Sequence, residues 1–242
     1  MADEIIKINL GCGAQGIEGW VNIDKDSRLT FGSNSLLKRM AAMASKAMNA
    51  KVSFAVTPPP NYMSINLLKG KLPFKDHTVS YCYTSHFLEH LPRHKSAQLL
   101  REVHRVMKKG GTLRVVVPDL AIFTEMYAAA KRGDKKAIKF WNEYMKEDFG
   151  SMNEKFNFIF AKFASQNNKW EGYGNPILAF AKKVLVADMD HQWMYDFEDL
   201  SRLIREAGFS QIRNTGFRKG KTPDLKRLDN RELESIYVEA TA

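Results

Sequence analysis

Cysteine is scarce in this chain of 242 residues, which contains only Cys12 and Cys82. Two cysteines build no disulfide framework, so a small secreted scaffold stapled by several bridges is excluded. The N-terminal stretch MADEIIKINL lacks both the basic start and the long apolar segment of a signal peptide. We therefore expect a reduced, cytoplasmic protein.

Long hydrophobic runs are also missing. A membrane-spanning helix needs about 20 consecutive apolar residues, and the best candidate, 177–186, is interrupted by Lys182 and Lys183. Hydrophobic residues make up 44% of the chain and charged residues 26%, which is ordinary for a globular protein. At this length we expect one domain over 1–242, with a full core and room for insertions.

Positive charge is present in excess, with a formal net charge of +10. Such an excess favours anionic partners: phosphorylated or saccharide metabolites, nucleic acid or an anionic membrane surface. Arginine-rich tracts, zinc knuckles and an aromatic RNA-binding signature are absent, so nucleic acid is possible but not favoured. A solvated, lysine-rich surface is the alternative explanation of the charge.

The first part of the chain is predicted to form strands around a glycine-rich turn. Residues 4–10 and 20–23 have the short apolar patterns of strands, and GCGAQG, 11–16, lies between them. Residues 31–60 form an insertion in which a Met- and Ala-rich helix, LLKRMAAMASKAM, precedes three prolines. The methionine stripe of that helix is typical of a packing element, a lid or a peripheral membrane contact.

The middle of the chain alternates strands with a helix. We predict strands at 63–68, 78–83 and 113–118, the last a nearly continuous apolar run typical of burial on both faces. A helix begins near Pro92 and is expected to end at 110–111, because proline suits a first turn and glycine an end. The remaining predicted elements are an amphipathic helix at 197–208 and strands at 211–217 and 235–241.

Residues 86–90, HFLEH, match H-x-x-E-H, a pattern of zinc peptidases in which two histidines on one helical face hold the metal. Here the stretch follows a predicted strand, and Pro92 starts a new helix directly after it. A continuous helix that presents both histidines is therefore not expected. We predict a strand-to-helix connection and no metal site, with a zinc peptidase as a remote alternative.

Three glycines, Gly11, Gly13 and Gly16, match G-x-G-x-x-G directly after a strand. A dinucleotide fingerprint also needs a full helix and an acidic residue about 20 positions later, whereas Asp24 follows much sooner. This spacing disfavours NAD. The turn either approaches another cofactor or is purely structural.

Several stretches, taken in order, resemble one enzyme family. They are similar to class I S-adenosylmethionine-dependent methyltransferases, in particular to the bacterial predicted methyltransferases of polysaccharide and cell-envelope gene clusters. The resemblance implies a Rossmann-like, doubly wound α/β sheet of seven strands with the last strand antiparallel, and a second insertion at 125–190 that covers the substrate. The stretches that carry it are INLGCG, GWVNIDKD, LPFKDHTVSYCYTSHFLEHLP, LLREVHRVMKKGGTLRVVVPDL and HQWMYDFEDLSRLIREAGF.

The resemblance also implies a binding site for S-adenosylmethionine. The glycine turn would wrap the methionine part, Asp24 would accept hydrogen bonds from the two ribose hydroxyls, and Asn66 would meet the adenine. Asn9 and Asn66 depart from the family, which usually has acidic residues there. The matching cofactor positions are Asn9, Gly11, Cys12, Gly13, Asp24, Asn66, Leu67 and Ser85.

Three residues are the candidates for the acceptor side. Methyl transfer needs in-line approach of a nucleophile and, for a hydroxyl acceptor, removal of a proton. The resemblance places Ser85 and His86 at the end of the fourth strand, beside the methyl group, with His86 as base or as a structural cap. His191 is the second candidate base. Asp119, at the end of the fifth strand, would face the substrate cleft.

The sequence thus supports two kinds of function. The favoured one is methyl transfer to a polar small molecule such as a sugar. The other is a non-catalytic descendant that binds the cofactor or a partner, which is suggested by Asn9, Asn66 and a short first helix. An RNA methyltransferase is a more distant alternative.

Overall fold

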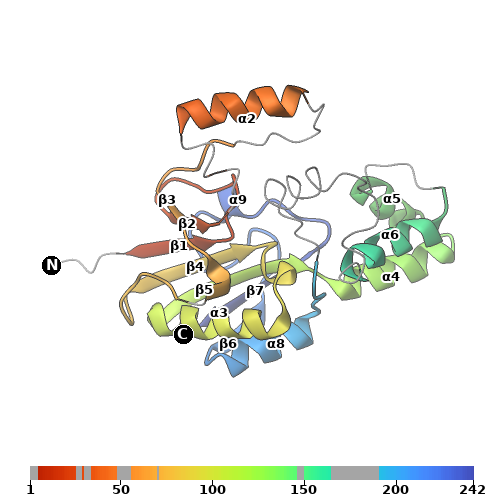
Figure 1. The fold of residues 1–242 in the computed structure, drawn as a ribbon. Coiled ribbons are helices and arrows are strands. Elements are labelled where there is room, and N and C mark those ends of the chain that lie inside the picture. The colour runs from red at the N-terminus through yellow and green to blue at the C-terminus, as the bar shows by residue number, and fades with distance from the viewer. Residues whose placement is uncertain are drawn as a thin grey trace.

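The computed structural model describes residues 5–25, 29, 34–47, 56–69, 71–145, 150–164 and 191–242. A seven-stranded sheet with the strand order β3-β2-β1-β4-β5-β7-β6 forms its centre (Figure 1). β7 runs antiparallel to both of its neighbours, and every other adjacent pair is parallel. The expected Rossmann-like fold class is confirmed. The strands are β1 (Ile6–Leu10), β2 (Val21–Asp24), β3 (Tyr62–Ser64), β4 (Val79–Ser85), β5 (Met107–Pro118), β6 (Ser210–Asn214) and β7 (Ser235–Thr241).

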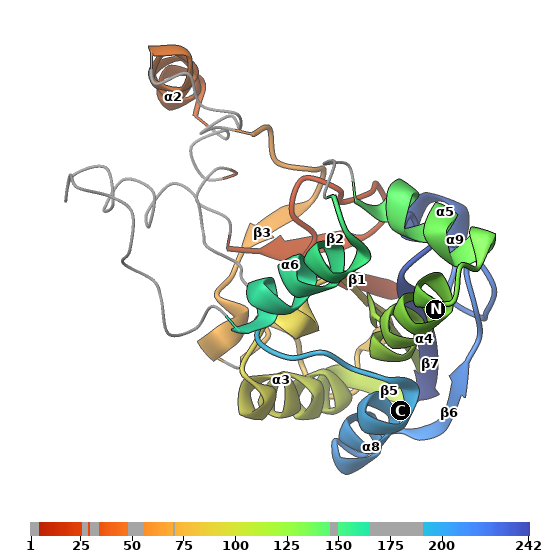
Figure 2. The same cartoon turned by 90° about the vertical axis from the view of Figure 1, so that its right-hand side faces the viewer.

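Two amphipathic helices, α3 (Arg93–Val106) and α8 (Phe197–Glu206), lie together on one face of the sheet (Figures 1 and 2). Their apolar stripes recur at helical spacing and are buried against the strands, which explains why these segments fold as helices at this place. The other face carries a smaller cluster around Trp20, Tyr83 and Tyr237, under the short helix α9 (Leu225–Leu228). The main core includes Leu99, Leu100, Val103, Leu200, Leu203 and Ile204 from the helices and Ile8, Cys82, Leu113 and Val115 from the strands.

Three helices lie beyond the end of β5. They stand beside the sheet in Figure 1 and in front of it in Figure 2. An aromatic cluster around Phe123, Phe140 and Trp141 holds them together. They occupy the first part of the predicted 125–190 insertion, and residues 165–190 lie outside the described residues. The helices are α4 (Leu120–Lys131), α5 (Lys135–Tyr144) and α6 (Met152–Ala164).

The helix of the first insertion is α2 (Ser35–Ala47), which stands apart from the sheet (Figure 1). Leu36, Met40 and Met43 are 65%, 59% and 72% exposed. The interpretation of this stripe as core packing is therefore wrong. Lid and membrane contact stay predictions; among the described residues, no helix is long and apolar enough to cross a membrane.

Several boundaries differ from those expected: β5 begins at Met107 instead of 113, and β6 ends at Asn214 instead of 217. α3 ends at Val106 instead of near 110–111, because the chain there pairs with its own C-terminal strand: Gly110 N–H donates to Ala242 O and Ala242 N–H to Gly111 O. The strand expected at 63–68 ends at Ser64. Asn66 Oδ1 accepts the N–H of Leu68 instead and opens a short 3₁₀ turn, η1 (Leu67–Lys69).

One buried charge interrupts the apolar run of β5. Arg114 is 0% exposed and forms a bidentate pair with Asp229, Nη2 to Oδ2 at 2.5 Å and Nε to Oδ1 at 3.1 Å. Its Nη1 also donates to Thr215 Oγ1 and Lys219 O. A buried guanidinium is tolerated only when such partners satisfy it. Arg114 therefore fastens the connection between β6 and β7 to the centre of the sheet.

We predict that Arg114→Met lowers the free energy of unfolding by about 3–5 kcal/mol, because it leaves the Asp229 carboxylate buried without its partner. Urea unfolding followed by circular dichroism measures this loss. Arg101→Met, which removes an exposed arginine from α3, is the matched control and should change stability by less than about 0.5 kcal/mol. Equal losses in the two variants would contradict the anchoring role.

Candidate functional site

The glycine-rich turn lies at the carboxyl end of β1, directly against the end of β2. Gly11 N–H donates to Ile23 O at 2.8 Å, and Gly13 N–H donates to Asp24 Oδ2 at 2.7 Å. Gly11 and Gly13 both have positive φ, +67° and +49°, which glycine adopts without steric cost. The turn and the acidic residue predicted to bind one cofactor thus contact each other directly.

Asp24 is oriented by these backbone bonds. Its Oδ2 accepts from Gly13 and its Oδ1 from the N–H of Lys25. Two such bonds from backbone N–H groups fix the direction of this carboxylate. The end of β3 adjoins it: Ile65 N–H and the Tyr62 hydroxyl both donate to Asp24 O.

Asn22 organises the loop that follows the glycine turn, and the sequence reading missed it. Its Nδ2 donates to Ile17 O, Trp20 O and Pro60 O, while its Oδ1 accepts from Ile17 N–H and from Asn9 Nδ2. A buried amide with all of these bonds holds one loop geometry. Asn9, proposed for the cofactor, is itself buried and supports this network.

Of the other predicted cofactor positions, Cys12 and Leu67 are buried, whereas Asn66 and Ser85 are partly exposed. Cys12 is buried, and its thiol donates to Gly13 O. Asn66 uses its amide oxygen to open η1, and Leu67 packs into the main core. Ser85 ends β4 and pairs in register with Val116 of β5.

Phe87 joins the glycine turn to the HFLEH stretch. A Cβ placed on Gly11 would lie 2.3 Å from the Phe87 ring, whereas one on Gly13 would have nothing within 4 Å. Gly11 is thus required for packing, and Gly13 faces open space. The sequence gives no signal for this contact because the two residues are distant along the chain.

The HFLEH stretch is the strand-to-helix connection that was predicted. Leu88–His90 form a single 3₁₀ turn, η2, and Pro92 caps the N-terminus of α3. Before the turn, His86 has a φ of +50° and its N–H donates to Val116 O. No helix presents His86 and His90 on one face here, so the geometry expected of an H-x-x-E-H peptidase helix is absent from this described stretch.

His86 is held from two sides. Its Nε2 lies 2.8 Å from Ser235 Oγ and its Nδ1 lies 3.4 Å from Glu89 Oε1. Burial, followed by the positive charge of Arg231, lowers the pKa of His86 to about 3. The imidazole is therefore neutral but a weak base, and this geometry suits positioning better than proton removal. Its catalytic role stays a prediction.

His191, about a hundred residues further along the chain, also lies near Glu89. The backbone N–H groups of Gln192 and Trp193 donate to Glu89 O at 2.6 and 3.1 Å, and the rings of His90 and His191 lie 4.6 Å apart, edge to face. The structure therefore brings two of the three predicted acceptor-side residues, His86 and His191, to one buried carboxyl group.

Asp119 follows the end of β5, and its N–H donates to Glu234 O. It caps the N-terminus of α4, where its Oδ1 accepts the N–H of Ala121. Burial raises its pKa, and the nearby Asp196 and Glu125 raise it further. A capping carboxylate beside other acids has a structural role here, and its predicted place in the substrate cleft remains untested.

The loop 229–235 closes the site, and the sequence reading missed it too. Asn230 Nδ2 donates to Gln15 Oε1 of the glycine loop at 2.7 Å, and Ser235 contacts His86. The signal was topological: because β7 runs antiparallel, its first residue lies where the parallel strands end. Tyr144 of α5 also approaches, and burial raises its pKa to about 12, with the Glu234 and Glu89 charges adding to the effect.

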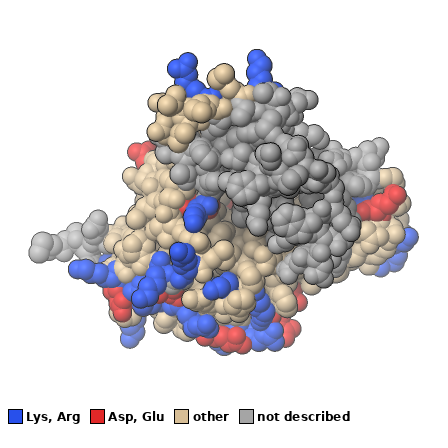
Figure 3. Space-filling model, viewed as in Figure 1, with Lys and Arg blue, Asp and Glu red and all other residues tan. Residues whose placement is uncertain are grey.

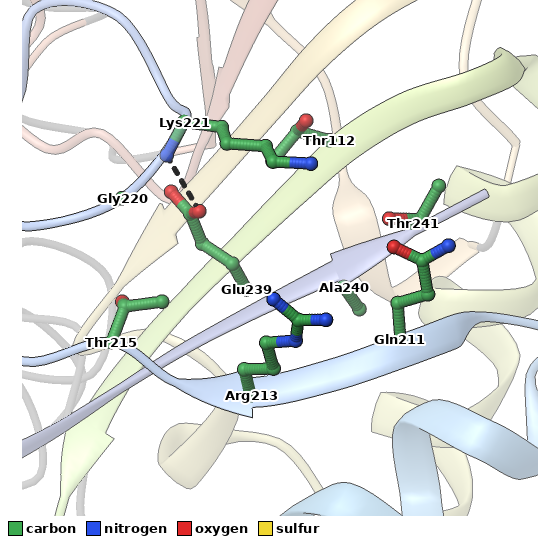
Figure 4. Close-up of a pocket in the computed structure, with 9 residues that line it drawn as sticks. All are labelled: Thr112, Gln211, Arg213, Thr215, Gly220, Lys221, Glu239, Ala240 and Thr241. Carbon is green, nitrogen blue, oxygen red and sulfur yellow. Dashed lines mark hydrogen bonds between the residues drawn. The ribbon is translucent and has the colours of Figure 1, made fainter.

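A separate hollow of about 200 Å³ lies across β5, β7 and β6 (Figure 4). Thr112 and Thr241, which line it, pair near the opposite end of β5 from His86. The one carboxylate among its lining residues, that of Glu239, accepts hydrogen bonds from the N–H groups of Lys221 and Thr222 and has a structural role. This hollow is not the candidate site.

Charge on the visible face does not form one basic patch. In Figure 3, Lys and Arg side chains are distributed over the described surface, with Asp and Glu among them in the lower part.

We predict that Gly11→Ala destabilises the protein more than Gly13→Ala. Both changes place a side chain at positive φ, but only the first drives a Cβ into the Phe87 ring. The expected difference in unfolding free energy is about 2 kcal/mol, measured by urea denaturation. Equal losses of unfolding free energy in the two variants would show that the Phe87 ring moves aside and does not restrict the glycine turn.

Comparisons with known proteins agree with this description. Residues 9–115 match the family model described as a methyltransferase domain. The search of curated proteins gives no match. Solved structures similar to the chain include a methyltransferase from Thermotoga maritima described as a possible histamine N-methyltransferase, at 16% identity, covering 98% of this chain and 82% of the other, with a TM-score of 0.43.

Two further solved structures are S-adenosylmethionine-dependent methyltransferases. One, from Archaeoglobus fulgidus, has 14% identity, covers 99% of this chain and 87% of the other, and has a TM-score of 0.45. The other, from Methanosarcina mazei, has 15% identity, covers 100% and 93%, and has a TM-score of 0.43. At these scores the likeness decides nothing by itself.

The assignment rests on the family match and on the observed strand order. The resemblance to enzymes of polysaccharide and cell-envelope gene clusters stays a prediction. Residues 9–115 include the glycine turn, Asp24 and HFLEH, and β7 and β6 complete the sheet in the expected order. Residues 9–115 thus match a methyltransferase domain, and they lie in a sheet with the strand order expected of class I S-adenosylmethionine-dependent methyltransferases.

Proposed function

We propose that this chain transfers a methyl group from S-adenosylmethionine to a polar small molecule, either a saccharide or an anionic metabolite. The observation that carries the proposal is the bond from Gly13 N–H to the Asp24 carboxylate at the adjoining ends of β1 and β2. It unites a glycine turn with an acidic residue at the edge where open α/β sheets bind ligands. When bound, the cofactor supplies a methyl group activated on a sulfonium.

The residues of the glycine turn would hold the cofactor. Gly13 faces open space, so a ligand can approach its backbone closely. The oriented Asp24 carboxylate suits two vicinal ribose hydroxyls, because both are donors and a carboxylate only accepts. Asn66 and Leu67 follow the end of β3 beside Asp24, where the adenine would lie.

The acceptor would enter on the side of η2. His86, Ser235 and His191 lie there, and Tyr144 of α5 is close enough to feel the Glu234 and Glu89 charges. Methyl transfer to an activated methyl group needs chiefly an aligned nucleophile, and such alignment is worth several kcal/mol of barrier. Imidazole and hydroxyl groups in a partly buried site are suited to hydrogen-bond a sugar-like acceptor. The spread positive charge favours an anionic one.

A non-catalytic cofactor-binding protein is the second candidate. Asn9 and Asn66 stand where the family usually has acids, and both amides make structural hydrogen bonds. Loss of two carboxylates weakens hydrogen bonding to the cofactor without altering the fold. Cofactor binding without methyl transfer to any offered acceptor would favour this candidate.

We predict micromolar binding of S-adenosylmethionine and of S-adenosylhomocysteine by isothermal titration calorimetry. Asp24→Ala should weaken both at least tenfold, about 1.4 kcal/mol, because the ribose loses its acceptor. Asp24→Asn keeps one oxygen for the Gly13 N–H and should lose less.

Glu206→Ala removes an exposed acid of α8 and is the matched control, with unchanged affinity. Binding by Asp24→Ala as tight as by the unaltered chain would remove the ribose assignment. Absence of binding by the folded, unaltered chain would overturn the proposed cofactor site. Transfer of labelled methyl to nucleotide sugars then separates the catalytic from the non-catalytic function.

A further inference from the structure

A cluster of side chains that can bind a metal ion lies at η2. Glu89, His90 and His191 each offer one ligand atom, and these three atoms lie within 4.8 Å of one another. Glu89 Oε1 and His90 Nε2 are 3.8 Å apart. The set joins two segments that are about a hundred residues apart in the chain, and of its members the methyl-transfer proposal uses only His191.

The backbone fixes this cluster from both segments. Glu89 and His90 belong to the single turn η2, whose ends are held by β4 and α3. Two N–H groups, from Gln192 and Trp193, donate to Glu89 O and hold the residues that follow His191. The ligand atoms are therefore brought together by ordered main chain.

The Glu89 carboxyl group is the unusual member. It is 0% exposed, and no described donor makes a hydrogen bond to either of its oxygens. The nitrogens near Oε1 are those of the imidazoles, His86 Nδ1 at 3.4 Å and His90 Nε2 at 3.8 Å. A buried carboxylate without hydrogen bonds costs several kcal/mol unless a proton or a cation neutralises it. Arg231 lies toward Glu234 instead, with Nη1 4.0 Å from Glu234 Oε1.

We propose that Glu89, His90 and His191 bind one divalent metal ion of the zinc class. Two imidazole nitrogens and one carboxylate oxygen form a donor set that suits zinc, and three protein ligands leave one position open. Tetrahedral zinc holds its ligand atoms about 3.4 Å apart, so rotations that move these side chains by about 1 Å complete the site. This inference departs from the sequence-based expectation of no metal.

The proposed set differs from the peptidase pattern that the HFLEH stretch matches. There both histidines of the pattern hold the metal and the glutamate is a base. Here Glu89 and His90 are neighbours on one turn, His191 comes from another segment, and His86 contacts Ser235. His86 lies against the Glu89 carboxylate and orients it from outside the metal set.

The test uses the full chain, stripped of metal with a chelator and titrated with Co²⁺, whose visible absorption reports tetrahedral nitrogen and oxygen ligands. We expect one Co²⁺ per chain, displaced by Zn²⁺. His191→Ala and Glu89→Gln should each weaken binding about 100-fold or more, because each removes a ligand or its charge. His94→Ala, which removes an exposed histidine of α3, is the control and should bind as the unaltered chain does.

Thermal unfolding gives a second readout that needs no visible band. Zn²⁺ should raise the Tm of the unaltered chain and of His94→Ala, but not that of His191→Ala. Absence of stoichiometric binding, or binding that persists in both His191→Ala and Glu89→Gln, would overturn the proposal. Neither readout involves S-adenosylmethionine, so the result is independent of the proposed transferase activity.

Discussion

A buried guanidinium holds together the segments that meet at the candidate site. Arg114 has no exposed surface, and its bidentate pair with Asp229 fixes the chain just before the loop 229–235. The next residue, Asn230, bonds to the glycine loop, and Ser235 reaches His86. Since removal of either charged partner leaves the other buried and unpaired, the loop has one strongly preferred position. The loop that closes the candidate site is thus held in place by Arg114, a buried charge in the sheet.

The sequence predicted the elements whose signals are local. The apolar run 113–118, the glycine turn after 4–10 and the proline before α3 each follow from a few adjacent residues, and all three stand where they were expected. The fold class came from the order of such stretches. Asp24 was identified through the family resemblance, which implies an acidic residue at the end of the second strand, and its bond to Gly13 is the contact that this position allows.

The remainder depends on contacts between distant residues. Nothing near Gly11 in the sequence indicates Phe87, and nothing near Arg114 indicates Asp229, because each pair forms only when the sheet assembles. The end of α3 was misplaced for the same reason: Gly110 pairs with the C-terminal residue, and this pairing outweighs the local preference of glycine for a helix end. The meeting of His86 and His191 likewise requires the tertiary fold.

The network of Asn22 has a consequence for the segment between β2 and β3. Asn22 Nδ2 donates to Pro60 O and Asn22 N–H donates to Asn61 O, so the end of this segment is held against β2, where the segment begins. The free energy of closing a loop changes only with the logarithm of its length. Residues between the two ends of the segment can therefore be gained or lost with little effect on the strand register or on the cofactor edge. A new surface can therefore be added at this insertion while the sheet stays the same.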